Sequence, residues 1–198
     1  MASTGKTRKW AELKKTLSKW EQRQLVELVK DLYDAAPINR DFLHARLLAD
    51  ADDDSVLGPY RERIVTQFFP KRGDPKLNLG EARKAIREYH KATGNAAGTV
   101  TLMLEYVECG ASFANEYGED SQAFYSSLES VLKELVTLLL EAEPDLCLQF
   151  RDRLSHFARI ANRLGWCFGE VVSEQMGLLD DHFDEFTDLL IDESPRTE

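Results

Sequence analysis

The stretch Val100-Thr-Leu-Met-Leu-Glu-Tyr-Val-Glu-Cys-Gly-Ala-Ser-Phe-Ala-Asn-Glu-Tyr117 decides the fold class. Wound into a helix, it carries apolar side chains on nearly all sides rather than along one stripe. A helix that is apolar all round is buried in the core of a domain. We therefore expect a central helix around which the rest of the chain packs. Gly110 predicts a close crossing with a neighbouring helix, because an interior glycine costs about 1 kcal/mol of helix propensity.

The segments on either side repeat apolar residues at every third or fourth position, the period of an amphipathic helix. Ser18–Glu21 and Asn78–Glu81 match capping boxes, and Gly58-Pro59, Asp120 and Pro144 mark further helix starts. No segment has the alternation of a strand. We expect an all-α fold, an irregular antiparallel helical bundle or stacked αα-hairpins of about seven or eight helices. A short α-solenoid is the second choice, because no repeat of fixed length is visible.

The length of 198 residues predicts one main domain. We expect a flexible basic N-terminus over 1–9, a single helical domain over 10–178, and an acidic amphipathic segment and tail over 179–198.

Several features bear on the location of the protein. The apolar runs are shorter than the ~20 residues of a membrane span, and no secretory signal is visible. Cys109, Cys147 and Cys167 are odd in number and widely spaced, which favours free thiols in a reducing compartment over disulfides or a zinc site. We therefore expect a cytoplasmic protein without a membrane partner, a metal or a cofactor.

The net charge of −10 is unevenly distributed. Residues 61–91 hold nine Lys/Arg against four acids, whereas residues 165–198 hold ten acids against Arg196. The basic segment is the best candidate for a binding surface. Three interpretations stay open: an ordinary solvated helix face, a docking surface for an acidic protein segment, and a nucleic-acid contact. Exposed aromatic residues that could stack on bases are absent from it, which disfavours single-strand recognition. Its residues are Lys71, Arg72, Lys76, Arg83, Lys84, Arg87 and Lys91.

The acidic C-terminal segment places four apolar residues on one side of a helix. Such a helix can dock into an apolar groove with a basic rim, on its own domain or on another chain. The four residues of this partner segment are Phe183, Phe186, Leu189 and Leu190.

Candidates for chemistry are few. Arg151 and His156 have the Arg-x4-His spacing of the α-helical HEPN ribonucleases, in which a guanidinium stabilises phosphate charge and an imidazole moves the proton. Asp152 and His156 share a helix face and could hold a metal, but no partner ligands accompany them. Glu105 and Glu108 on the central helix need cationic partners if they are buried, and Arg83 of the basic segment is the expected one.

Several stretches, in their order, resemble a family of small bacterial proteins known only as a domain of unknown function. The resemblance spans about residues 17–140 and implies a helical scaffold without an assigned activity. Its pieces are Leu28-Val-Lys-Asp-Leu-Tyr33, Phe68-Phe-Pro70, Glu81-Ala-Arg-Lys-Ala-Ile-Arg-Glu-Tyr89, Leu102-Met-Leu-Glu-Tyr-Val-Glu-Cys-Gly110 with Phe113, and Ala123-Phe-Tyr-Ser-Ser-Leu128.

Together these features favour a non-enzymatic interaction module that binds a protein partner or forms a homodimer. One alternative is a HEPN-like, metal-independent ribonuclease that uses Arg151 and His156. The other is a nucleic-acid binder that uses the basic surface of residues 71–91.

Overall fold

The structure, a computed structural model, describes residues 10–47, 54–119, 121–165 and 167–192, with the side chains of all but 54–55 and 184–192. In these ranges all regular structure is helical, which confirms the all-α prediction. There is one more helix than the upper expectation, because residues 10–17 form a helix of their own. The nine helices are α1 Trp10–Leu17, α2 Gln22–Ala35, α3 Pro37–Leu47, α4 Asp54–Phe68, α5 Leu79–Thr93, α6 Ala96–Tyr117, α7 Gln122–Leu140, α8 Pro144–Ala161 and α9 Phe168–Asp192.

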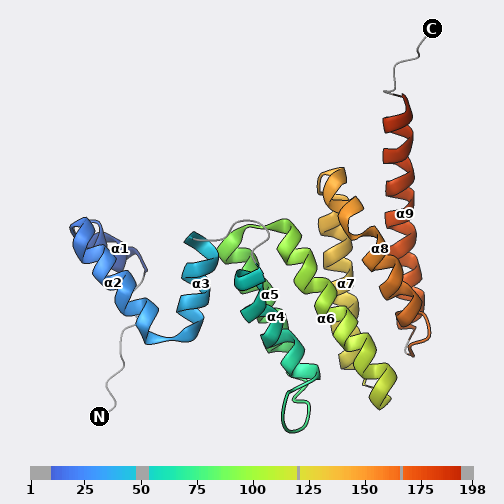
Figure 1. The fold of residues 1–198 in the computed structure, drawn as a ribbon, viewed down its shortest axis with the longest axis horizontal. Helices are drawn as coiled ribbons and strands as arrows, with labels where there is room; N and C mark the ends of the chain where they lie inside the picture. The colour runs from blue at the N-terminus through green and yellow to red at the C-terminus, as the bar shows by residue number, and fades with distance from the viewer. Residues whose placement is uncertain (1–9, 48–53, 120, 166, 193–198) are drawn as a thin grey trace.

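The helices stand side by side in an elongated row, with α1 and α9 at opposite ends (Figure 1). From α4 to α9, consecutive helices run in opposite directions and form the hairpins α4–α5, α6–α7 and α8–α9. Along the row α4 packs on α6 and α6 on α8, while α3 packs on α5 and α7 on α9. The fold is therefore a stack of αα-hairpins, one of the two expected forms.

The central helix α6 is buried along most of its length, as its sequence predicted. It packs on α4, α5, α7 and α8. A Cβ atom added to Gly110 would lie 2.3 Å from Cδ2 of Leu128 in α7, so the predicted close crossing is present. Phe68 packs edge-on against Tyr106 of this helix, which joins α4 to the same core.

The helix boundaries follow the sequence signals in part. Asn78 caps α5 by accepting a hydrogen bond from the backbone of Glu81, and Pro144 begins α8, as expected. The capping box of α2 is formed by Glu21 and Gln24 instead of Ser18 and Glu21, because the chain before Glu21 belongs to α1 and the turn after it. Pro59 lies inside α4 and not at its start.

Two further observations concern the start of α7 and the course of α9. Asp120 lies outside the described residues, and the α7 cap in the structure is Ser121, whose hydroxyl accepts from the backbone of Phe124. Residues 168–192 form one continuous helix, α9, which runs across the expected division at 178/179.

We call residues 10–47, which hold α1, α2 and α3, the N-terminal arm. Within it only Ala45 is buried. The arm is joined to the rest of the row by α3, which packs on α5 and α4. Nη1 of Arg46 also donates a hydrogen bond of 3.2 Å to the carbonyl of Ala92 at the end of α5.

Candidate functional site

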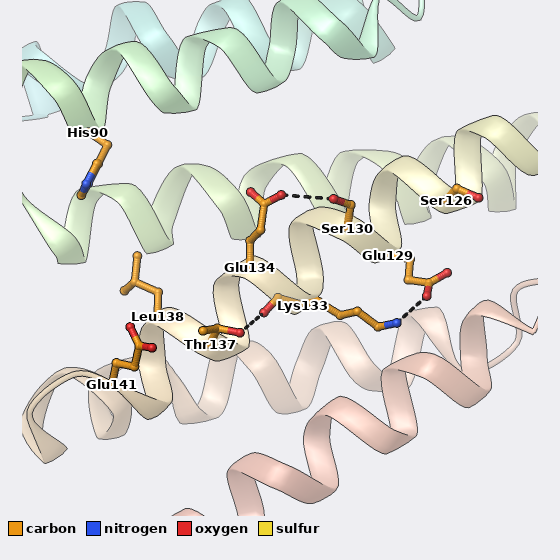
Figure 2. A pocket seen from close by; sticks show the side chains of 9 residues that line it. All are labelled: His90, Ser126, Glu129, Ser130, Lys133, Glu134, Thr137, Leu138 and Glu141. Carbon is orange, nitrogen blue, oxygen red and sulfur yellow. Dashed lines mark hydrogen bonds and ion pairs between the residues drawn. The ribbon is translucent and has the colours of Figure 1, made fainter.

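A hollow lies between α5 and α7, which both pack on α6 (Figure 2). We call it the α5–α7 groove, and its volume is about 890 Å³. One side of α7 provides most of the lining, because the apolar residues of α7 face α6 and leave the polar ones outside. Sequence analysis missed the groove, although a polar row at helical spacing on α7 was its signal. Its lining residues are His90, Ser126, Glu129, Ser130, Lys133, Glu134, Thr137, Leu138 and Glu141.

His90 points from α5 into this groove (Figure 2). Its Nδ1 lies 3.2 Å from the hydroxyl oxygen of Thr99. The Thr99 hydroxyl donates to the carbonyl of Asn95 at 2.7 Å. The single hydroxyl proton of Thr99 is used in that hydrogen bond. The oxygen can therefore only accept a hydrogen bond from His90, which places a proton on Nδ1 of the ring. In the neutral ring Nε2 is then an acceptor.

Most charges of the groove are already paired. Lys133 and Glu129 lie 2.6 Å apart. Nη2 of Arg83 on α5 reaches Glu134 of α7 at 2.8 Å and Ser130 at 3.2 Å, so an ion pair bridges the two walls. In the described part of the chain, no three His, Cys, Asp or Glu side chains lie close enough together to hold a metal ion. Leu138 is the one apolar residue of the lining, and the other lining residues contribute both polar groups and the aliphatic parts of their side chains.

The basic surface expected from sequence is divided by the structure. Arg83 is tied to Glu134, and Lys84 lies within 3.9 Å of Glu81 and 3.8 Å of Glu88. Lys71 pairs with Glu62 at 2.7 Å in the open, and this holds the pKa of the Glu62 carboxyl below its ordinary value. Those without an ion pair to a described residue are Arg72, Lys76, Arg87 and Lys91.

Arg63 of α4 also reduces the positive charge available around α5. Its guanidinium contacts Glu81 and Glu88, each at 2.7 Å. The α4–α5 hairpin therefore holds a compact, largely neutral charge network.

The ribonuclease candidates occupy the exposed side of α8 without meeting. Arg151 lies over the ring of Phe183, 5.0 Å from its centroid. Nδ1 of His156 lies 3.2 Å from Nη2 of Arg159, which can only donate. Five residues apart on a helix, Arg151 and His156 point about 140° from one another. Within one chain they form no common site, and Asp152 brings no further ligand to His156.

The proposed partner segment is described only at Phe183. Its side chain is buried and contacts Arg151, so this residue packs on its own chain. Phe186, Leu189 and Leu190 belong to α9, and their side chains lie outside the described residues.

Glu105 and Glu108 find their cation on α8 instead of α5, so the expectation of Arg83 is wrong. Arg153 donates two hydrogen bonds to the carboxylate of Glu108, from Nε at 2.9 Å and from Nη2 at 2.5 Å. Its Nη2 also donates to Oε2 of Glu105 at 3.2 Å. Arg61 of α4 approaches Glu105 at 3.7 Å. Burial, followed by the nearby charges of the two glutamates, raises the pKa of Cys109 to about 12. This cluster joins α4, α6 and α8.

The N-terminal arm carries an apolar surface that the rest of the described chain leaves exposed. The stripe of α2 has helical spacing, yet α1 and α2 contain no buried residue. Of the twelve large apolar side chains exposed in the described residues, nine belong to the arm: Trp10, Leu13, Trp20, Val26, Val29, Leu32, Ile38, Phe42 and Leu47.

No family model, curated protein or solved structure matches the chain. None of the described helices combines the length and apolar character needed to cross a bilayer.

Proposed function

We propose that this chain is a non-enzymatic helical interaction module that binds a protein through the apolar face of its N-terminal arm. The observation that carries the proposal is the concentration of exposed apolar side chains on α1, α2 and α3. Single exposed apolar residues are ordinary on soluble proteins, so what marks the arm as a contact surface is that this one segment of three consecutive helices holds nine of the twelve exposed large apolar side chains in the described residues. Val26 and Leu47 are 61% and 70% exposed, so the described part of the chain leaves them largely uncovered.

The energetics of protein contacts favour the arm over the α5–α7 groove. Interfaces depend on a few apolar or aromatic anchors that become fully desolvated on binding. The arm offers Trp10, Trp20 and Phe42 for this role, whereas the groove has only Leu138 among polar groups that already pair with one another.

The two alternatives lack a comparable supporting observation. The ribonuclease needs Arg151 and His156 in one cleft, and a nucleic-acid contact needs unpaired cations. Lys71, Arg83 and Lys84 are held by glutamates, so such a contact would rest on the remaining four basic residues, Arg72, Lys76, Arg87 and Lys91. We place the module in the cytoplasm, because its three cysteines are free thiols, as a reducing compartment maintains them.

The proposal is tested by replacing two exposed valines of the arm, Val26→Glu and Val29→Glu, in one variant. The matched control changes Leu148→Glu and Leu178→Glu, which lie at exposed positions on α8 and α9. Each tagged protein is returned to its host and the retained proteins are identified by mass spectrometry. We expect at least one protein, whether another protein or untagged copies of the chain itself, to be retained by the wild type and the control but lost by the arm variant. Retention that is the same for all three proteins would overturn the proposal.

A further inference from the structure

We infer that the partner of the arm is the arm of a second copy, with the two α2 helices packed antiparallel about a two-fold axis. This inference rests on the proposed function, because it names the occupant of the same surface. It is carried by the order of apolar and charged side chains along α2.

The apolar part of the contact is a short stripe. Val26, Val29 and Leu32 follow one another at intervals of three residues and therefore lie on one side of the helix. Their side chains are 61%, 41% and 49% exposed. Val29 lies near the middle of α2, so the stripe of an antiparallel second copy can pack over the whole stripe of the first.

A row of four charged residues runs beside this stripe. Arg23 pairs with Glu27, with Nε and Oε1 at 3.3 Å, and Lys30 pairs with Asp34 in the same i, i+4 relation. All four side chains are more than half exposed, so neither α1 nor α3 covers this flank. In chain order the charges read positive, negative, positive, negative.

An alternating row of this kind is complementary to its own reverse. When a second α2 lies antiparallel, Arg23 comes opposite Asp34 of the other copy, and Glu27 comes opposite its Lys30. A parallel pairing in register would instead place the two charged rows on opposite sides of the contact, where they do not meet. Electrostatic complementarity therefore selects the antiparallel arrangement, in which each copy uses the same patch, as in two-fold dimers.

The contact is expected to be weak and concentration-dependent. Exposed ion pairs contribute little each, and two helices of 14 residues cover less area than a standard interface. The charges thus decide partner and direction more than affinity, while the valines and Leu32 supply the apolar contact.

The test mixes two charge-reversed chains. Arg23→Glu and Asp34→Arg are made separately, and self-association is measured by analytical ultracentrifugation over a concentration series. Each variant alone sets like charges opposite each other twice, so its dimer should dissociate roughly tenfold more readily than the wild type. An equimolar mixture should recover the wild-type affinity, because the new carboxylate of one chain then faces the new guanidinium of the other.

The mixture separates the contact between copies from effects within one helix. Each variant has lost an i, i+4 ion pair of its own α2, and mixing cannot restore that pair. Recovery on mixing therefore supports antiparallel pairing, and a mixture as weak as its components overturns it. Far-UV circular dichroism checks that the variants keep their helix content.

A second measurement does not depend on charge. Val29→Cys, made with Cys167→Ser to remove the exposed native thiol, lies near the proposed axis and should give a covalent dimer with a short bifunctional maleimide. Gln149→Cys in the same background, exposed on α8, should not. Equal cross-linking of the two would sink the inference.

The inference and the proposed function can fail separately. If the wild type is a monomer at every concentration but another protein is lost with Val26→Glu and Val29→Glu, self-pairing is wrong and the interaction module stands. If the wild type is a monomer and no retention depends on these valines, both are wrong.

Discussion

At the scale of single residues, the same substitution, glycine to alanine, is expected to have opposite effects on stability at Gly110 and at Gly177. A methyl group on Gly110 would lie 2.3 Å from the buried side chain of Leu128, while nothing lies within 4 Å of one on Gly177. We expect Gly110→Ala to destabilise the fold by about 1–3 kcal/mol, since overpacking outweighs the gain in helix propensity. Gly177→Ala should stabilise it by about 0.5–1 kcal/mol. Urea denaturation of both variants measures the difference.

A double-mutant cycle tests the cause. Leu128→Ala alone should cost about 2–5 kcal/mol, but in the Gly110→Ala background the new methyl group occupies part of the vacated space. The double variant should therefore be more stable than the sum of the two single changes implies. Strict additivity would show that the crossing relaxes in another way.

Residue-scale features were predictable where the cause is local. Asn78 and Pro144 act within a turn of their own position, and the structure places them in the expected roles. For Gly110 the local signal indicated a close crossing, but not that α7 is the helix that crosses there. The partner of Glu108 is not a local matter. Arg83 and Arg153 are equally good cations in the sequence, and only the packing of α8 on α6 brings Arg153 within reach.

At the scale of helices, the Arg153 cluster connects α4, α6 and α8. Arg153→Ala would leave the carboxylates of Glu105 and Glu108, each about three-quarters buried, with much weaker compensation. We expect a loss of about 1–3 kcal/mol, below the value for a fully buried pair because the side chains keep some contact with water. Arg163 is exposed and lies two residues after the end of α8. Arg163→Ala should therefore change stability by less than about 0.5 kcal/mol. Chemical denaturation of both proteins provides the comparison.

Neutralising the orphaned carboxylates distinguishes charge from packing. Adding Glu105→Gln and Glu108→Gln to Arg153→Ala should recover part of the lost stability, because an uncompensated charge costs more than a neutral amide. No recovery would mean that the aliphatic part of Arg153 holds α8 in place.

The helices themselves were predictable in proportion to the strength of their patterns. The apolar α6 was identified from its sequence alone. Residues 10–17 were not assigned a helix of their own, because eight residues give only two turns of pattern. Pro59 was expected at a helix start, yet α4 begins at Asp54, early enough for Pro59 to fall in its second turn.

At the scale of the whole molecule, the buried titratable groups predict a loss of stability in alkali. Burial raises the pKa of Tyr60 to about 12, and burial with nearby carboxylates does the same for Cys109. In the unfolded chain these groups release protons at their ordinary values of 10.0 and 9.0. Stability from these groups is thus complete below pH 9 and is lost as pH rises from there toward 12.

Urea denaturation near neutral pH and near pH 10.5 measures how steeply the stability falls with pH. The unfolding free energy should fall by about 1–2 kcal/mol between them on account of Cys109 alone. Cys109→Ala should flatten the slope above pH 9, whatever its effect at neutral pH. An unchanged slope in that variant would contradict the assignment.

The surfaces of the molecule were the least predictable part. The basic segment was visible in the sequence, and Lys84 pairs with Glu81 and Glu88 of its own helix. The pairing of Arg83 with Glu134, however, depends on the position of α7. The α5–α7 groove and the uncovered face of α2 likewise arise from which helices become neighbours. Periodicity shows that a helix has an apolar side, but not whether another helix covers it.

Because the arm buries almost nothing, its amide hydrogen exchange should be sensitive to whatever binds it. Short helices are marginal in water and take their stability from what they pack against. With Ala45 as the sole buried anchor, α1 and α2 should open more readily than the rest, and their amide hydrogens should exchange fastest when the surface is empty. Slowed exchange confined to these two helices would then reveal, without any label on the other molecule, that something has settled on them.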